Sequence, residues 1–430
     1  MSTFEGKLLE DSLHYIRIDQ FEPNNHDGTV FFLSHFHTDH FKGLFGEAFL
    51  KVLIENENKK LYCTPVTKHL IKRHPRCKIP DHKIIPLVVN ECKPLYYEGQ
   101  HRVVVRVLPA GHCPGSAMFL FEEETTTGTR RVLYTGDFRI NPEELYKFKA
   151  LHNSDGSLKK LHTLYLDTTF CDPRWISFPS RKQSEEDLIE IAQNWLKTSP
   201  DHKVGILYNS YHGLEHLLIN VADVLKTKIH VRDLQSYENY ACIPELHPAL
   251  CQKESDSRVH LCSVKEMEWC KICRSDQINT KIIKPCAQSF TSKQLELGRQ
   301  KEGRPGLVRI AYSLHCSLEE LIGTVKYLKP DVVHPCALPR NLTEEQVLAN
   351  LLLDVVKLKQ ELQEKSTCTT SPPKKRFCRS LTPEESEVEE EEEEPSTPDK
   401  SKHGVLFFVS CSDEEANKPL SQNSIDSPPL

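Results

Sequence analysis

The stretch "FLSHFHTDHFKG", residues 32–43, follows an apolar run and decides how the whole chain is interpreted. Within six residues it contains four side chains that can bind metal ions: His35, His37, Asp39 and His40. A His-x-His pair on a tight turn can hold one ion, and the aspartate and histidine that follow can hold a second. The alternative is a polar surface loop that happens to contain histidines. Four potential ligands directly behind a predicted strand favour the metal site.

The same arrangement, a short apolar run that ends in a polar turn, recurs along the chain. The later turns are "PAGHCPGS" with His112, "GDFR" with Asp137, "DTTF" with Asp167 and "LHCS" with His315. Helical patterns over 186–196 and 318–328 separate some of the runs. Strands whose carboxyl ends all deliver polar side chains predict a layered α/β fold with its site at one edge of a sheet.

Composition indicates a globular body followed by a tail of different character. Of the 430 residues, 38% are hydrophobic and 27% are charged, which is ordinary for a protein with a sizeable core. The formal net charge is -6, but the segment from Ser366 to Leu430 carries 7 Lys/Arg and 14 Asp/Glu, so the body is nearly neutral. A neutral body has no global field that attracts nucleic acid or membrane. Binding of a polyanion would therefore need a local patch or a metal.

The 16 cysteines and the N-terminal sequence favour a reducing compartment. "MSTFEGKLLEDS" lacks the basic and apolar regions of a signal peptide, and no apolar run is long enough to span a bilayer. The cysteines are therefore expected to be thiols or metal ligands rather than disulfides. The sequence after Lys365 is rich in Pro, Ser and Glu, which predicts disorder. Its basic cluster at 374–379 suits a nuclear-import signal or a solvated basic run.

Taken together, the motifs resemble those of the metallo-β-lactamase superfamily. The histidine-rich stretch is followed by His112 and Asp137 in that family's order, and Asp19 in "IRIDQF" matches its first motif. Asp167 in "YLDTTFCDP" and His315 in "SLHCS" resemble the extra motifs of the β-CASP branch, which contains the superfamily's nucleases. The sequences of these stretches most resemble those of the DNA end-processing members of that branch.

This resemblance implies an α/β fold: a metallo-β-lactamase αββα sandwich with an inserted β-CASP domain and a disordered C-terminal tail. The implied boundaries are 1–156 for the first part of the sandwich and 157–308 for the β-CASP domain. The second part of the sandwich is expected at 309–362, and the disordered acidic tail at 363–430.

The resemblance also implies a metal-dependent hydrolase with one or two zinc ions in its active site. The first ion is expected on His35, His37, His112 and Asp137, a mixed N/O set. Asp39 and His40, with Asp137 as a bridge, are expected to hold a second ion, and Mg²⁺ is a further candidate for activity. Bound metal lowers the pKa of water to about 7 and so supplies hydroxide at neutral pH.

The resemblance places Asp39, Asp167, His315 and Asp19 in catalytic roles. Asp19 is expected to orient the histidine loop. Asp167 is expected to orient His315, which would act as the general acid toward the leaving oxygen. Taken alone, Asp167 is equally suited to a helix N-cap and His315 to a buried core histidine.

A second group of potential ligands lies in the expected β-CASP domain. His260 and Cys262 occur in "VHLC", Cys270 and Cys273 in "MEWCKIC", and His230 in "KIHVRD". Two His and two Cys can form a structural zinc site, and plain buried thiols are the alternative. The resemblance assigns the zinc to His230, His260, Cys262 and Cys273. Cys270 is the alternative to Cys273 as the fourth ligand.

The resemblance favours DNA over RNA as the substrate. RNA-cutting β-CASP enzymes usually carry a further histidine after the next strand, and the family spacing from Pro330 reaches Ala337 rather than His334. A shift of three residues would reverse that assignment.

The expected function is a nuclear DNA nuclease, a 5' exonuclease and structure-selective endonuclease of double-strand break or cross-link repair. Its expected partners are DNA ends, overhangs and hairpins, and an end-joining kinase or ligase complex, with no membrane. An RNA-processing nuclease and a non-catalytic repair protein of the same fold are the alternatives.

Overall fold

The computed structural model describes residues 2–97, 101–208, 212–232, 240, 243–274, 278–303 and 306–367. The basic cluster at 374–379 and the predicted disordered tail beyond residue 367 lie outside the described residues. The last described element is helix α9 (Val355–Thr367), which continues past the expected boundary at 362.

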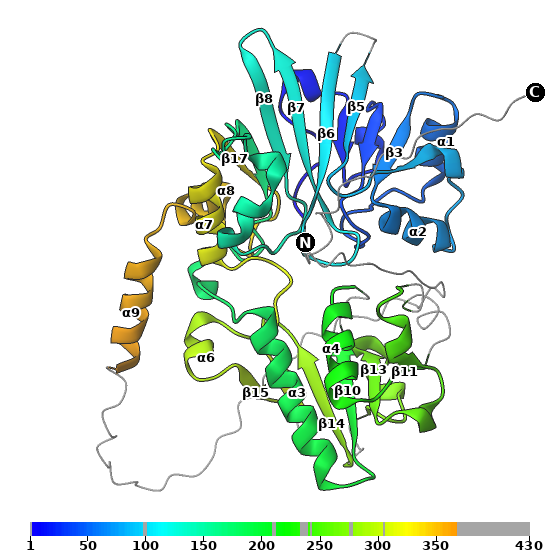
Figure 1. The fold of residues 1–430 in the computed structure, drawn as a ribbon, viewed down its shortest axis with the longest axis vertical. Helices are drawn as coiled ribbons and strands as arrows, with labels where there is room; N and C mark the ends of the chain where they lie inside the picture. The colour runs from blue at the N-terminus through cyan, green and yellow to red at the C-terminus, as the bar shows by residue number, and fades with distance from the viewer. Residues whose placement is uncertain are drawn as a thin grey trace, which may run out of the picture.

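Two sheets form the larger domain, which occupies the upper part of Figure 1. The first sheet is parallel, in the order β1 (Ile16–Ile18), β2 (Val30–Phe32), β3 (Lys60–Cys63) and β4 (Ile84–Pro86). The second sheet has the order β17 (Val332–Pro335), β9 (Thr163–Leu166), β8 (Gly128–Tyr134), β7 (Ala117–Thr125), β6 (His101–Pro109) and β5 (Cys92–Tyr97). Strands β5 to β8 pair antiparallel, whereas β8, β9 and β17 pair parallel.

Apolar side chains of the two sheets pack against each other and form the central core of this domain. Phe32 of the first sheet contacts Phe119 of the second, with ring centroids 4.9 Å apart. Helices α1 (Glu47–Ile54) and α2 (Pro65–Arg73) pack on the outer face of the first sheet. Helices α7 (Leu318–Leu328) and α8 (Glu344–Asn350) cover the outer face of the second. The predicted αββα sandwich is confirmed.

The cap domain lies below the sandwich in Figure 1 and is built on a seven-stranded sheet. Its strand order is β12 (Leu250–Cys251), β11 (Ile229–Val231), β13 (Val259–Ser263), β10 (Lys203–Tyr208), β14 (Thr280–Pro285), β16 (Leu307–Ile310) and β15 (Gln300–Glu302). Only β15 pairs antiparallel within this described sheet. Its helices are α3 (Arg181–Thr198), α4 (Glu215–Leu225) and α6 (Ser292–Glu296).

The strand pairing corrects both predicted limits of the inserted domain. β9 pairs with β8 and β17, so the sandwich continues to Leu166, past the expected boundary at 157. β16 pairs with β14 and β15, so the cap sheet continues to Ile310, past the expected boundary at 308. Apolar runs predict strands but not which sheet they join, because sheet membership depends on pairing between distant segments.

Two segments, 167–180 and 311–317, join the sandwich to the cap. Each leads into a predicted helix whose first turn is closed by a capping box: Ser180 with Gln183 begins α3, and Ser317 with Glu320 begins α7. Among the described residues, no helix combines the length and apolar character that crossing a membrane would require.

Candidate active site

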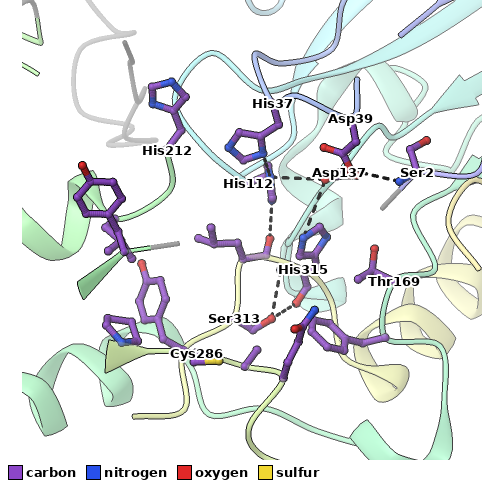
Figure 2. A pocket seen from close by; sticks show the side chains of 18 of the residues that line it. Ser2, His37, Asp39, His112, Asp137, Thr169, His212, Cys286, Ser313 and His315 are labelled. Carbon is purple, nitrogen blue, oxygen red and sulfur yellow. Dashed lines mark hydrogen bonds and ion pairs between the residues drawn. The ribbon is translucent and has the colours of Figure 1, made fainter. Parts of the chain in front are cut away.

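The polar turns that follow β2, β6, β8, β9 and β16 meet at the junction of the sandwich and the cap. They line a cavity of about 370 Å³. Figure 2 shows His37, His112 and Asp137 on the sandwich side of this cavity, with His212 and Cys286 on the cap side. The carboxyl ends of strands from two domains thus bring chemically active side chains into one space.

Four of the predicted ligands form a compact group: His35, His37, His112 and Asp137 have ligand atoms within 4.8 Å of one another. The Asp137 carboxylate lies 3.6 Å from Nε2 of both His35 and His112. Nδ1 of His37 lies 3.1 Å from Nε2 of His112. Three imidazoles and one carboxylate are a donor set that suits Zn²⁺.

The hydrogen bonding of these histidines supports a metal ion at this place. The Nε2 atoms of His35 and His37 are buried and have no hydrogen-bond partner among the described residues. Burial holds the pKa of His35 and His112 well below the usual range and lowers the pKa of His37 to about 4. Buried, neutral imidazoles with unpaired nitrogens are costly unless an ion uses the lone pairs. The residues present therefore fit a metal.

Asp39 and His40 lie next to this group on the other side of Asp137. His40 Nε2 is 3.2 Å from Asp137 Oδ1 and 3.9 Å from Asp39 Oδ2. Burial opposes protonation of His40, but Asp137 and Asp19 raise its pKa well above the usual value. Asp39 Oδ2 also accepts a hydrogen bond from the Ser2 backbone N–H at 3.2 Å. These positions suit a second ion that shares Asp137 with the first.

Asp19 lies behind the histidine loop rather than facing the cavity. It accepts hydrogen bonds from Ser34 N–H at 2.7 Å, Ser34 Oγ at 2.6 Å, Tyr134 Oη at 2.9 Å and His40 Nδ1 at 2.9 Å. Its φ of 59° is in the left-handed region, which costs a non-glycine residue about 1–2 kcal/mol. These four bonds hold Asp19 in place, and Asp19 in turn fixes the orientation of His40.

The predicted pair Asp167 and His315 is formed at the edge of the metal group. His315 Nδ1 lies 2.8 Å from Asp167 Oδ2, and His315 Nε2 lies 3.9 Å from Asp137 Oδ2. Burial opposes protonation of His315, but Asp167 and Asp137 raise its pKa above the usual value. Asp167 also accepts bonds from both the N–H and the hydroxyl of Thr169. His315 is thus held with Nε2 toward the cavity, where it can give up a proton (Figure 2).

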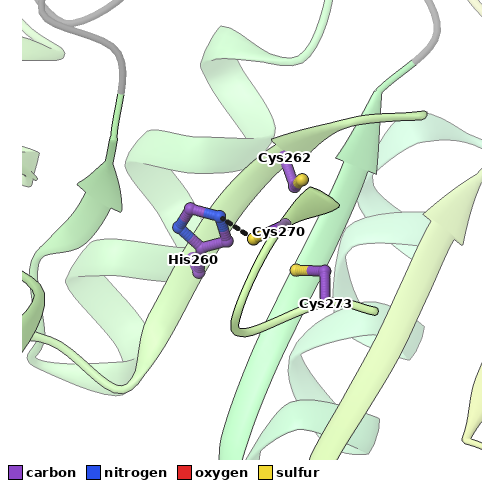
Figure 3. Close-up of side chains that lie close together, drawn as sticks. All are labelled: His260, Cys262, Cys270 and Cys273. Carbon is purple, nitrogen blue, oxygen red and sulfur yellow. Dashed lines mark hydrogen bonds between the residues drawn. The ribbon is translucent and has the colours of Figure 1, made fainter. Parts of the chain in front are cut away.

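A second group lies inside the cap, and its members differ from the predicted set. His260, Cys262, Cys270 and Cys273 are buried and have ligand atoms within 4.8 Å of one another (Figure 3). Cys270 Sγ lies 3.2 Å from His260 Nε2. Hydrogen bonding with Cys262 and Cys273 holds the Cys270 pKa far below its usual value. One imidazole and three sulfurs suit tetrahedral zinc.

His230 was expected in this second group but lies beside it. It sits on β11 directly opposite His260 of β13, and the Nδ1 atoms of the two rings are 3.0 Å apart. His260 therefore faces His230 with one nitrogen and Cys270 with the other. The spacing of "WCKIC" did not decide between Cys270 and Cys273, because the turn after residue 269 brings both thiols to His260.

The structure also locates the two residues that bear on the choice of DNA or RNA. His334 on β17 packs its ring on Tyr165, with centroids 4.9 Å apart, and belongs to none of the ligand groups found among the described residues. Ala337 is buried, and its carbonyl accepts a hydrogen bond from the Thr168 hydroxyl.

Sequence reasoning missed several residues that support the site. Ser34 and Tyr134 bond Asp19, Ser2 bonds Asp39, and Thr169 bonds Asp167. Hydroxyl and backbone groups are too common for spacing to single them out, so nothing in the sequence pointed to these four.

Comparison with known proteins shows which proteins this chain is similar to. The family model described as DNA repair metallo-beta-lactamase matches residues 244–341. Protein artemis of Mus musculus is 33% identical over 363 residues, covering 81% of this chain and 50% of the relative. The 5' exonuclease Apollo of Rattus norvegicus is 34% identical over 310 residues, covering 71% of this chain and 50% of the relative. The chain thus spans about half the length of these relatives.

Proposed function

As a homologue of Artemis and Apollo, this chain belongs to the metallo-β-lactamase/β-CASP nuclease family, and from that premise we propose that it is a metal-dependent DNA nuclease. Its reaction is the hydrolysis of phosphodiester bonds. The observation that carries the proposal is the position of the Asp167–His315 pair beside the group formed by His35, His37, His112 and Asp137. A metal-binding group and a proton donor share one cavity.

Each side chain of the site has a role that follows from its contacts. When bound, a divalent ion supplies a water of lowered pKa and offsets the charge of the phosphodiester. His35, His37, His112 and Asp137 would hold the first ion, and Asp39 and His40, together with Asp137, would hold a second. We assign zinc to the first ion, because three neutral imidazoles are typical zinc ligands. Mg²⁺ remains a candidate for activity.

Proton transfer is assigned to His315. Its Nε2 donates a proton to the leaving oxygen, while Asp167 holds Nδ1 at 2.8 Å and stabilises the charged ring. Asp19 keeps His40 in position through Nδ1. In the cap, His260, Cys262, Cys270 and Cys273 would hold a separate structural zinc, which would stabilise that domain.

The finer assignments extend the same proposal. The substrates are DNA ends, overhangs and hairpins, cut by 5' exonuclease and structure-selective endonuclease activity in double-strand break or cross-link repair in the nucleus. An end-joining kinase or ligase complex is the partner class. The position of His334 on Tyr165 supports DNA over the RNA-processing alternative. The complete set of ligands supports an enzyme over a non-catalytic repair protein.

A cleavage assay tests the proposal directly. The purified chain would be given labelled 5'-phosphorylated single strands, duplexes, overhangs and hairpins of DNA, with RNA of matching sequence as the competing substrate. We expect DNA to be cut first, near junctions of single and double strand, and we expect His315→Ala to lose about 10²-fold or more in rate. Equal or faster cutting of RNA would favour the RNA-processing alternative. No cutting of either polymer with metal bound would favour the non-catalytic one.

A further inference from the structure

Two arginines lie where the sandwich and the cap are joined. Arg139 follows Asp137 in the turn after β8, and Arg181 is the first residue of α3 in the cap. We propose that these two side chains form a clasp that holds the cap over the metal site and so positions His112 and His315. The expected effect of the clasp on cleavage rests on the proposed function. Its expected effect on the structure of the junction does not. Arg139 and Arg181 are positioning residues in this proposal, because neither is assigned to the substrate.

The Arg139 side chain ties together both segments that join the domains. Its Nη1 donates to the Ser313 carbonyl at 3.0 Å, and its Nη2 donates to the Pro179 carbonyl at 3.0 Å. The carboxylate of Glu320, at the start of α7, neutralises the guanidinium at 3.0 Å. Only 6% of the Arg139 side chain is exposed. A planar fork with five N–H donors can make these bonds at once, which a single ammonium cannot.

The carbonyl at Ser313 belongs to the segment that carries the proposed proton donor. The Ser313 hydroxyl donates to the His315 carbonyl at 2.8 Å and accepts from the His315 N–H at 3.2 Å. Between them, the Leu314 carbonyl faces Nδ1 of His112 at 3.1 Å. Fixing Ser313 therefore fixes the place of His315 and orients the ring of one metal ligand.

Arg181 makes the reciprocal connection, from the cap to the sandwich. Its Nη2 donates to the Gly111 carbonyl, directly before His112. The same loop is held from the sandwich side, because the Arg139 N–H donates to the Ala110 carbonyl at 3.0 Å. Gly111 has φ of 63°, and a Cβ there would lie 2.8 Å from the Arg139 carbonyl oxygen, so the loop fits closely against Arg139. The two arginines thus hold the His112 loop from both domains.

The closeness of the clasp to the reacting groups predicts an effect on turnover. A displacement of 1 Å in a catalytic group can lower a rate about 10²-fold. Loss of the Arg139 bonds frees the 311–317 segment at its middle, while all of the proposed metal ligands stay intact. We therefore expect slower cleavage with the metal retained.

The matched control is Arg17, which is equally buried but lies away from the junction. Its side chain is 5% exposed, forms an ion pair with Asp27 at 2.6 Å and donates to the Ile16 carbonyl at 2.8 Å. Arg17→Gln removes the same kinds of bond as Arg139→Gln, so both should lower the melting temperature. They should differ in turnover and in hydrogen exchange of the joining segments.

The experiment measures bound metal, kcat and KM on single-stranded DNA, and amide hydrogen exchange over 311–317. For Arg139→Gln we expect metal as in the parent, kcat lower by about 10²-fold, KM within about threefold, and faster exchange. Arg139→Lys should be intermediate and gives a second variant if the glutamine form does not fold. Adding Arg181→Gln should lower kcat less than additively, because residues that act as a unit are not additive.

Two results would overturn the clasp. One is a loss of kcat in Arg139→Gln no greater than in Arg17→Gln, and the other is unchanged exchange over 311–317. If the parent protein cuts no DNA, the proposed function fails by itself. In that case, hydrogen exchange over 311–317 is the measurement that tests whether the clasp exists.

Discussion

The two groups that can hold metal ions lie in different domains and differ in both chemistry and surroundings. The group at the junction has three imidazoles and a carboxylate, borders a cavity and lies next to the ionisable pair Asp167 and His315. The group in the cap has one imidazole and three thiols, all of them buried. Structural zinc sites are closed and rich in sulfur, whereas catalytic sites keep a position open to water or substrate.

The type of ligand and the access of substrate to the site together distinguish the expected catalytic role of the junction group from the expected structural role of the cap group. An ion at the junction can reach a substrate, so its loss should stop chemistry and leave the fold. An ion in the cap can only connect β13 to the turn that follows it, so its loss should weaken the fold and leave the chemistry.

The largest effect is expected at the junction, from His37→Ala. The variant should lose about 10³-fold or more in DNA cleavage, because the ion that activates water is no longer held. Its melting temperature should stay near that of the parent, since His37 is not part of a hydrophobic core. Cleavage rates and elemental analysis on the same sample check both statements.

Asp137→Asn should behave in the same way, because Asp137 lies within 3.9 Å of His35, His40, His112 and His315. His152→Ala is the control, since His152 bonds Tyr327 and belongs to no ligand group among the described residues. Full activity in the double variant His37→Ala, Asp137→Asn would show that the group at the junction takes no part in cleavage.

The opposite pattern is expected in the cap, from Cys262→Ser. Bound metal should fall by about one equivalent and the melting temperature should drop, since a structural ion contributes folding free energy directly. Cleavage per folded molecule should be kept. Cys251→Ser is the matched control, a buried thiol outside the group on β12, the edge strand of the same sheet. An unchanged metal count in Cys262→Ser would favour plain buried thiols.

The membership of the cap group gives a finer test of the same site. Cys270→Ser should release the ion, because Cys270 is one of the four side chains within 4.8 Å of one another. His230→Ala should only weaken it, by about 10–100-fold in affinity, through the loss of a partner for His260. Metal titration of the two variants distinguishes them. The reverse order of effects would restore His230 as a ligand in place of Cys270.

A smaller effect is expected behind the junction, from Asp19→Asn. The change weakens the bond that orients His40, so affinity for the second ion should fall by about 10–100-fold. Added metal should recover most of the cleavage, which distinguishes this variant from His37→Ala. A metal titration of activity measures the shift. Loss of activity at every metal concentration would instead place Asp19 among the groups that act directly.

How much could be predicted from the sequence depended on whether the residues were neighbours in the chain. His35, His37, Asp39 and His40 lie in one turn, so their spacing already indicated a metal site. His112, Asp137 and His315 were predicted from similar turns, but only the fold shows that these turns meet. The sheet that β9 joins, and the grouping of Cys270 rather than His230 with the other cap side chains, depend on tertiary pairing, which spacing does not encode.

The smallest effect is expected from His334→Ala, which tests whether the histidine on β17 belongs with the junction group. The His334 ring packs against Tyr165 in a tilted arrangement, and aromatic pairs contribute about 0.5–1.5 kcal/mol, so the melting temperature should fall slightly. Cleavage of DNA should stay within about threefold of the parent, because His334 belongs to no ligand group among the described residues, so its loss removes no ligand. The ratio of DNA to RNA cleavage should also stay constant. A loss of about 10²-fold with the fold intact would mean that His334 reaches an ion during the reaction. In that event His334 would be a further metal ligand at the junction, and the RNA-processing alternative would be favoured, because RNA-cutting enzymes of this fold usually carry such a histidine.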